Sequence, residues 1–289
     1  VTGYTSRSLD GNTHAGGNDI FLVKYNSSGI KQWTKQLGTS SADVGQGVTS
    51  DSAGNIYVTG YTSGSLDGNT SAGLWDIFLV KYNSSGSKQW TKLLGSSSSD
   101  LATGVTSDSA GNIYLTGYVY GSLDGNTYLG GGPDIVLAKY NSSGTKQWTK
   151  LLGTSSNEIG NGVTSDSAGN IYLTGYTYGS LDGNTSAGDQ DIFLVKYNSS
   201  GSKQWTKQFG TSSKENGLAM TSDSADNIYV TGQTSGSLDG NTSAGGWDIF
   251  LAKYNSSGIN SADVEPAKST VTLHNLDDDT DVTVALSSS

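Results

Sequence analysis

Short apolar runs recur along the chain, and turns rich in Gly, Ser, Asn and Asp separate them. In residues 56–61, aliphatic residues and Gly alternate with Tyr and Thr, which is the period of a β-strand. Residues 77–80 read Ile-Phe-Leu-Val and would be apolar on both faces of a strand. No segment shows the 3.6-residue period of an amphipathic helix. The pattern therefore predicts an all-β protein built from short strands.

The same pattern returns five times. The tyrosine of K-Y-N-S-S-G marks each copy, at Tyr25, Tyr82, Tyr140, Tyr197 and Tyr254. The steps between these tyrosines are 57, 58, 57 and 57 residues. The one extra residue lies between Asp124 and Asp134, which marks that stretch as a loop. A fixed period of this length indicates a repeat architecture.

Each repeat unit is predicted to contain four strands. In the third copy they are residues 104–107, 113–118, 134–140 and 146–152. The sequence D-S-A-G-N turns the first strand into the second, and its aspartate, Asp108 in this copy, is expected to organise that turn. The sequence N-S-S-G turns the third strand into the fourth. Glycine ends N-S-S-G because a left-handed residue closes a short hairpin at little cost. A long loop of about 15 residues joins the second and third strands.

A sheet with two apolar faces must be covered on both sides. Because no helix is predicted, only a neighbouring unit can provide that cover, so the sheets must stack face to face around an axis. This is the arrangement of blades in a β-propeller. The tryptophans of the fourth strands are predicted to pack between blades, with a ligand platform as the alternative. They are Trp33, Trp90, Trp148 and Trp205.

The strand count leaves two places unfilled. Second and third strands occur five times, but first and fourth strands occur only four times each. The tail adds two strand-like runs, Ser269–Leu276 and Asp281–Ser287, which brings the total to five blades of four. We therefore expect residues 1–258 to form a five-bladed propeller and residues 259–289 to close the ring, which removes exposed sheet edges. The alternative is that the tail begins a sandwich domain.

Two segments carry a family resemblance. Residues 47–62 read G-V-T-S-D-S-A-G-N-I-Y-V-T-G-Y-T, and residues 76–90 read D-I-F-L-V-K-Y-N-S-S-G-S-K-Q-W. With their copies in residues 1–258, they resemble the bacterial SBBP repeat, the beta-propeller repeat family. The resemblance implies secreted or surface-attached bacterial proteins without established catalytic residues. The family is named for a seven-bladed ring, so the five copies here form either a complete five-bladed ring or part of a larger one.

Composition narrows the partners and the compartment. The net charge is −10, which disfavours nucleic acid and anionic membranes. No apolar run approaches 18 residues, so we expect no membrane insertion. Cysteine is absent, which excludes disulfides and thiolate chemistry. The chain starts at Val1 without a visible signal peptide, as a processed or trimmed product would.

The sequence contains no recognisable enzyme motif. It lacks H-E-x-x-H, G-x-S-x-G and a phosphate-binding loop that opens a helix. His14 and His274 lie outside any metal-binding spacing and are expected to be exposed bystanders. Repetition argues against catalysis as well, because turnover needs different groups in different roles, whereas five copies place equal groups around an axis. We expect a protein that is not an enzyme.

An aspartate recurs in the sequence L-D-G-N-T of every long loop. The five residues are Asp10, Asp67, Asp124, Asp182 and Asp239. Each precedes the aspartate that begins the third strand by 9 or 10 residues. Such oxygen ligands could bind calcium, but the D-x-D-x-D run and the bidentate Glu of known calcium loops are missing. The alternative is a turn in which Asp and Asn bond local amides, without any cofactor.

The copies differ most in the long loop, where we predict exposed aromatic residues beside polar ones. The candidate ligand-binding residues are Trp75, Trp247, Tyr120, Tyr178 and Asp189. Such aromatic side chains can stack on sugars or contact a protein partner. The alternative is tolerated drift of a surface loop.

These observations predict a non-catalytic, extracellular or cell-surface propeller that serves as a structural or adhesive interaction module. Its partner would be a protein or a surface glycan. A lectin with one sugar site in the loop of each blade is the alternative, and an enzyme with a central pocket is the third hypothesis. A tail that closes a neighbour's ring would produce a homo-oligomer or a fibre.

Overall fold

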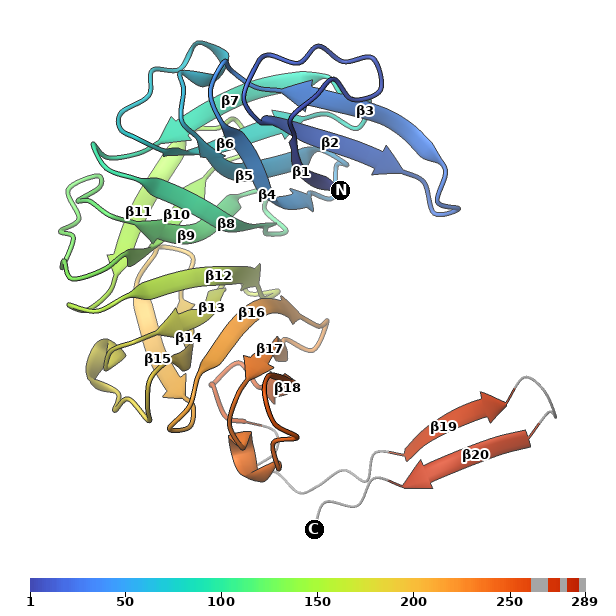
Figure 1. Cartoon of the computed structure of the whole chain (residues 1–289), viewed down its shortest axis with the longest axis vertical. Coiled ribbons are helices and arrows are strands. Elements are labelled where there is room, and N and C mark those ends of the chain that lie inside the picture. Colours follow the sequence, from blue (N-terminus) through green and yellow to red (C-terminus); the bar gives the residue numbers. More distant parts are fainter. Residues whose placement is uncertain (261–269, 276–279, 286–289) are drawn as a thin grey trace.

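The computed structural model describes residues 1–260, 270–275 and 280–285, and in this part of the chain nearly all regular structure is β-strand. Strands β1 to β18 form five sheets that follow one another along an arc (Figure 1). The first sheet contains β1 (Thr2–Thr5), β2 (Asp19–Tyr25) and β3 (Lys31–Leu37). The prediction of an all-β chain built from small antiparallel sheets is confirmed.

The three middle sheets have four strands each, in the order of the sequence. The second sheet contains β4 (Asp43–Ser50), β5 (Ile56–Thr62), β6 (Asp76–Tyr82) and β7 (Lys88–Leu94). The third contains β8 (Asp100–Ser107), β9 (Ile113–Val119), β10 (Asp134–Tyr140) and β11 (Lys146–Leu152). The fourth contains β12 (Glu158–Ser165), β13 (Ile171–Thr177), β14 (Asp191–Tyr197) and β15 (Lys203–Phe209). Each predicted unit is therefore one sheet.

The fifth sheet has three strands, β16 (Glu215–Ser222), β17 (Ile228–Thr234) and β18 (Asp248–Tyr254). In three long loops a short 3₁₀ turn follows the second strand, as η1 (Leu66–Gly68), η2 (Leu181–Gly183) and η3 (Leu238–Gly240). The tail contributes β19 (Thr270–Asn275) and β20 (Thr280–Ala285), which pair with each other.

The first strand of each unit is longer than predicted. β8 begins at Asp100 and its register shifts between Ala102 and Gly104, so a β-bulge joins two segments that pair with the same partner strand. Gly117 lies opposite the bulge, and a Cβ atom there would approach the Leu101 carbonyl oxygen to 1.9 Å. The bulge interrupts the alternation of side chains between the two faces. The first half of the strand therefore could not be recognised from a simple alternating pattern.

First strands line the inner edge of the arc (Figure 1). The Thr103 hydroxyl donates to the Gly160 carbonyl across 2.6 Å, and the Asn161 amide donates to the Gly217 carbonyl across 2.8 Å. These hydrogen bonds connect β8, β12 and β16, which belong to three successive sheets. The inner strands therefore fix the spacing of the blades.

The core lies between the sheets, as the two apolar faces require. Ile77 and Leu79 of β6 are fully buried in one cluster with Leu115 and Val136 of the next sheet. Equivalent clusters occupy the other three junctions. Each fourth-strand tryptophan packs at the side of one cluster, and Trp90 lies 6.0 Å from Tyr57 between ring centroids. The packing interpretation of these tryptophans is confirmed.

The turn between the first two strands is organised by its aspartate, as predicted. Asp108 accepts hydrogen bonds from the backbone and side-chain nitrogens of Asn112, both at 2.8 Å. It also accepts a bond from the Tyr114 hydroxyl at 3.0 Å. The same three bonds recur in every complete copy of the motif.

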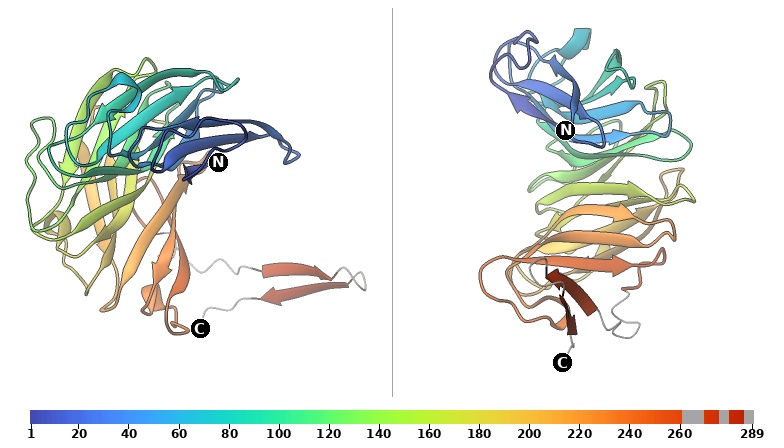
Figure 2. Two further views of the ribbon diagram at one scale, coloured as in Figure 1. Left: turned by 45° about the horizontal axis from the view of Figure 1, so that its top comes forward. Right: turned by 90° about the vertical axis from the view of Figure 1, so that its right-hand side faces the viewer.

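The predicted ring closure is not seen in the described residues. The first sheet lacks a first strand and the last sheet lacks a fourth strand. β19 and β20 pair only with each other among the described strands. Figures 1 and 2 show an arc whose two ends do not meet. The outward face of the last sheet is consequently bare, with Ile249 89% and Leu251 72% exposed.

Candidate functional site

The repeated aspartates of the long loops face lysines of the fourth strands. Asp67 accepts hydrogen bonds from the Lys88 ammonium and, at 2.6 Å, from the Thr91 hydroxyl. The same pairing joins Asp10 to Lys31, Asp124 to Lys146, and Asp182 to Lys203. Each aspartate has a positive φ, between 49° and 57°, and therefore forms the left-handed corner of its loop.

These partners do not favour calcium at the five aspartates. In the first four copies a lysine ammonium already forms an ion pair with the carboxylate. In addition, the described residues contain no cluster of three or more His, Cys, Asp or Glu that could hold a metal ion. The predicted turn is present, but its side-chain chemistry differs from the expectation. Asn69 bonds the local Leu66 carbonyl at 3.1 Å, whereas Asp67 reaches across to the fourth strand.

We expect Asp67→Asn to lower the stability by no more than about 1 kcal/mol, because exposed ion pairs contribute little. The decrease should be the same with calcium and with a chelator, because the partner of Asp67 is a lysine. Thermal melts of the wild-type and variant chains in both buffers measure this. A melting temperature that calcium raises only in the wild type would restore the calcium hypothesis.

His14 is not the exposed bystander that the sequence predicted. Its Nδ1 lies 3.1 Å from the carboxylate of the fully buried Asp19. His274 lies in β19, where the structure describes only the backbone. His14 therefore belongs to a junction between blades, although no other copy has a histidine there.

Buried carboxylates occur in pairs at the blade junctions, which the sequence analysis missed. Asp76 begins β6, Asp100 begins β8, and both are fully buried. The other three pairs are Asp19 with Asp43, Asp134 with Glu158, and Asp191 with Glu215. Each member binds a loop amide four or five residues before it, as Asp100 does with the Ser96 nitrogen at 2.6 Å. The signal available in the sequence was an acidic residue at the start of two strands in every copy.

One oxygen of each of the first four third-strand aspartates has no hydrogen-bond partner among the described residues, and Asp100 Oδ1 has none either. Burial raises the pKa of Asp100, and the charge of Asp76 raises it further. The glycine after each fourth strand packs against the pair, and a Cβ atom on Gly95 would approach Asp76 Oδ1 to 1.8 Å. The pairs are thus acidic, buried and tightly enclosed, and each member fixes the loop that precedes it.

Aromatic pairs mark the long-loop end of the three middle sheets. Tyr61 lies 5.2 Å from Trp75 between ring centroids, and in the next sheet Tyr118 lies 6.1 Å from Tyr120. The fourth sheet repeats this with Tyr176 and Tyr178 at 6.0 Å. We call these six residues the aromatic stripe. Its outer members are exposed, with Trp75 at 41%, Tyr120 at 44% and Tyr178 at 40%.

The aromatic stripe is continuous from sheet to sheet. Burial raises the pKa of Tyr118, and the nearby hydroxyls of Tyr120, Tyr176 and Tyr61 add to the effect. The pKa of Tyr176 is raised in the same way, by burial and by the hydroxyls of Tyr178 and Tyr120. Groups that influence each other's ionisation lie close together. The second-strand tyrosines of the three middle sheets therefore lie near one another across the blade junctions.

The remaining two candidate residues lie outside the stripe. Trp247 is exposed on the last sheet, where Gln233 replaces the partner tyrosine of the stripe. Asp189 forms an exposed ion pair with Lys214, at 3.5 Å between Oδ2 and Nζ. The structure therefore brings together three of the five predicted residues, and it adds the second-strand tyrosines that the sequence analysis did not select.

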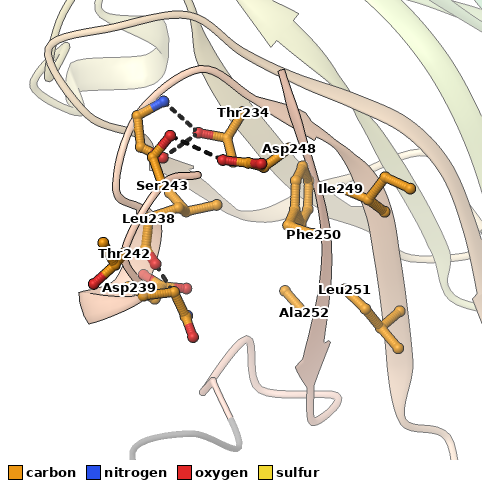
Figure 3. Close-up of a pocket in the computed structure, with 12 residues that line it drawn as sticks. Thr234, Leu238, Asp239, Thr242, Ser243, Asp248, Ile249, Phe250, Leu251 and Ala252 are labelled. Atoms are coloured by element: carbon orange, nitrogen blue, oxygen red, sulfur yellow. Dashed lines mark hydrogen bonds between the residues drawn. The ribbon is translucent and has the colours of Figure 1, made fainter. Parts of the chain in front are cut away.

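A pocket lies on the last sheet (Figure 3). It encloses about 260 Å³. Leu238 and Asp239 of η3 form one wall, and Phe250 and Ala252 of β18 form the other. We call this space the open groove. It occupies the place where the other sheets have their fourth strand.

Four-stranded antiparallel sheets that stack face to face along a common inner edge define a β-propeller repeat protein. The model of the SBBP beta-propeller repeat matches residues 32–67, 89–124, 147–182 and 204–239. The chain belongs to this family. The matched segments run from the fourth strand of one sheet to the long loop of the next, so each crosses a junction between blades.

Two curated relatives are much longer than this chain. The regulatory protein FlaEY of Caulobacter vibrioides is 26% identical over 270 residues, which cover 83% of this chain and 27% of the relative. An uncharacterised WD repeat-containing protein of Acanthamoeba polyphaga mimivirus is 27% identical over 261 residues, covering 69% of this chain and 19% of the relative. The chain thus spans about a quarter or less of the relatives it matches.

Solved structures resemble the chain more distantly. A Bacteroides caccae protein of unknown function has a TM-score of 0.45 and 11% identity, covering 84% of this chain and 73% of that one. A gluconolactonase of Xanthomonas campestris has a TM-score of 0.44 and 10% identity, covering 84% and 67%. No helix in the described part of the chain is long and apolar enough to cross a membrane.

Proposed function

We propose that this chain is a non-catalytic interaction module of an extracellular or cell-surface protein, which binds a protein or a surface glycan through its long loops. The observation that carries the proposal is the aromatic stripe. Three neighbouring blades place Trp75, Tyr120 and Tyr178 on one exposed surface, while the frameworks beneath them are nearly identical. Exposed aromatic clusters of this kind are typical of binding surfaces.

The distribution of variation supports this function. The second, third and fourth strands repeat with few changes, whereas the long loops carry different residues before the third strand in each copy. A rigid scaffold with variable loops is a common basis for recognition. The titratable groups fit the same proposal, because the buried carboxylates are engaged in blade contacts rather than aimed into a pocket. No cofactor is needed for such a role.

The test is binding of the fluorescent full chain to bacterial cell surfaces and to a glycan array. Replacing Trp75, Tyr120 and Tyr178 together by Ala should weaken binding by roughly tenfold or more, because central aromatic contacts typically contribute over 1 kcal/mol each. Tyr25→Ala is the matched control, since Tyr25 is similarly exposed at the end of the arc. Equal losses in the two variants, or no binding to either target, would refute the proposal.

A lectin function is the second candidate, and the continuity of the stripe favours it. Aromatic rings that follow one another across blades can stack on successive sugars of an extended glycan. The affinity should then rise with oligosaccharide length, and Trp75→Ala should weaken the binding of long glycans more than the binding of short ones. Isothermal titration with a length series measures both. One independent site per blade predicts instead an affinity that does not depend on length.

The complete ring belongs to the same proposal. We propose that the arc is completed into a closed propeller, either of five blades with the tail or of more blades in a longer protein. Both ends of the arc support this, since Leu251 and Tyr25 are exposed at positions that the middle sheets bury. A tail that enters a neighbouring copy would instead join chains into an oligomer or a fibre. Size-exclusion chromatography of the full chain, and of a chain ending at Asn260, distinguishes these forms.

A further inference from the structure

The outer edge of the last sheet lacks the strand that the three middle sheets have. β18 is the final strand of its sheet, whereas β6, β10 and β14 each pair with a fourth strand. The open groove runs along this edge beside η3, as Figure 3 shows. A second cavity of about 240 Å³ extends it toward Lys253 and Asn260.

In the fourth sheet, the same place is filled and its contacts are specific. Asp182 accepts hydrogen bonds from the Lys203 ammonium and the Thr206 hydroxyl. The Asn184 side chain donates to the Thr206 carbonyl at 3.4 Å. A lysine and a threonine three residues later therefore anchor the fourth strand to its loop. The second and third sheets use the same two anchors.

The last sheet retains the loop residues that would bind the lysine and the threonine of a fourth strand. Asp239 and Asn241 line the open groove at the positions of Asp182 and Asn184. In the described part of the chain Asp239 has no lysine partner, and it accepts only a long hydrogen bond of 3.4 Å from Asn260. Asn241 still bonds the Leu238 carbonyl at 3.1 Å. The groove thus offers a carboxylate, an amide donor and the backbone edge of a strand.

The sequence that follows lacks the residues that mark a fourth strand in the other copies. Alignment with the fourth copy places Asn260 at the position of Lys203, Ala262 at that of Trp205 and Asp263 at that of Thr206. An aspartate in place of this threonine would set two like charges together, which is unfavourable. Pro266 takes the place of Phe209 and has no backbone donor. The chain's own continuation therefore lacks both anchors.

We propose that the open groove binds an extended segment of another polypeptide that carries Lys-x-x-Thr, by adding it to β18 as a fourth strand. Main-chain hydrogen bonds to the edge supply affinity, and the lysine and threonine on Asp239 supply register. The incoming strand displaces Asn260, which meets Tyr254 through an isolated bridge. This site lies on a different sheet from the aromatic stripe and is independent of the function proposed for it.

The probe is a labelled peptide with the sequence of residues 202–210, Ser-Lys-Gln-Trp-Thr-Lys-Gln-Phe-Gly. Fluorescence anisotropy with the full chain should show saturable binding. Asp239→Asn should weaken it by about tenfold or more, because hydrogen bonds to charged groups are the strong ones. Asp182→Asn is the matched control and should leave the affinity unchanged, since its groove is filled. A peptide with Glu in place of the first Lys should bind as poorly as a scrambled one.

A chain that ends at Asn260 separates the remaining explanations. Equal affinity of the shortened and full chains supports the proposal. Binding by the shortened chain alone would overturn it, because the chain's own tail would then hold the groove. Absence of binding to both chains, or the same loss in Asp182→Asn and Asp239→Asn, would also overturn it. In the bound full chain, hydrogen exchange of the β18 amides should slow at least tenfold while that of β14 stays unchanged.

Discussion

Leu194→Ala should destabilise the protein by about 2–5 kcal/mol, the usual cost of deleting a buried leucine side chain. Leu194 is fully buried in the junction between the fourth and fifth sheets, in one cluster with Ile228 and Val230. Each blade is stable mainly through its neighbours in repeat proteins. The loss should therefore loosen the last blade first, which hydrogen exchange of β16 to β18 would show beside a denaturant titration.

Leu251→Ala is the matched control for this prediction. Leu251 holds the same repeat position as Leu194, but it is 72% exposed because none of the described sheets covers it. Its replacement should change the stability by no more than about 0.5 kcal/mol. Similar losses in both variants would mean that another surface, such as the tail or a second copy, covers the last sheet in solution.

Asp100→Asn should stabilise the protein at pH 7 by about 1–3 kcal/mol, because a buried unpaired acceptor costs that much. In the wild type, Asp76 Oδ1 and Asp100 Oδ1 both lack protein partners within one buried junction. An asparagine side chain can donate to Asp76 and still accept the Ser96 nitrogen. Urea unfolding of the wild-type and variant chains measures the difference.

The direction of the pKa shift determines how the stability contributed by Asp100 changes with pH. Burial, assisted by Asp76, raises the pKa of Asp100 above its ordinary value, so the folded chain binds this proton more tightly than the unfolded chain. The associated stability is fully present below the ordinary pKa of about 3.9 and is lost as the pH rises through the raised value. The difference between wild type and Asp100→Asn should therefore grow from pH 4 upward.

Asp223→Asn provides a control with the opposite sign. Hydrogen bonds from Asn227 lower the pKa of Asp223 to about 2, so its contribution is present at neutral pH and is lost as the pH falls toward that value. Asp223→Asn should thus remove stability at pH 7 and little at pH 2. If Asp100→Asn destabilised the chain at neutral pH, the acid-pair interpretation of the junction would be wrong.

Local pattern was enough to predict the blade framework. The alternation in residues 56–61 and the double-sided run 77–80 predicted strands that need sheets on both sides, and β5 and β6 are those strands. The turn aspartates were predicted because their partners lie within six residues, as Asp108 and Tyr114 do. Interactions this short in sequence leave a local signature.

Longer-range contacts could not be predicted. Asp67 lies in a loop whose oxygen-rich composition suits calcium. Only the folded structure shows that Lys88, 21 residues away, reaches its carboxylate. The buried pair of Asp76 and Asp100 depends on two loops that meet across a junction. Likewise, Tyr61, Tyr118 and Tyr176 come near one another only because successive blades stack face to face.

The sequence by itself determined the repeat, the four-stranded unit and the need for face-to-face stacking, because every copy contains the same pattern of apolar and polar positions. Only the tertiary structure decided which side chains from different copies meet, and that the described sheets form an arc with an unfilled edge at β18. The reason is physical: identical units have identical local preferences, so the difference between a middle blade and an end blade lies solely in which neighbours are present.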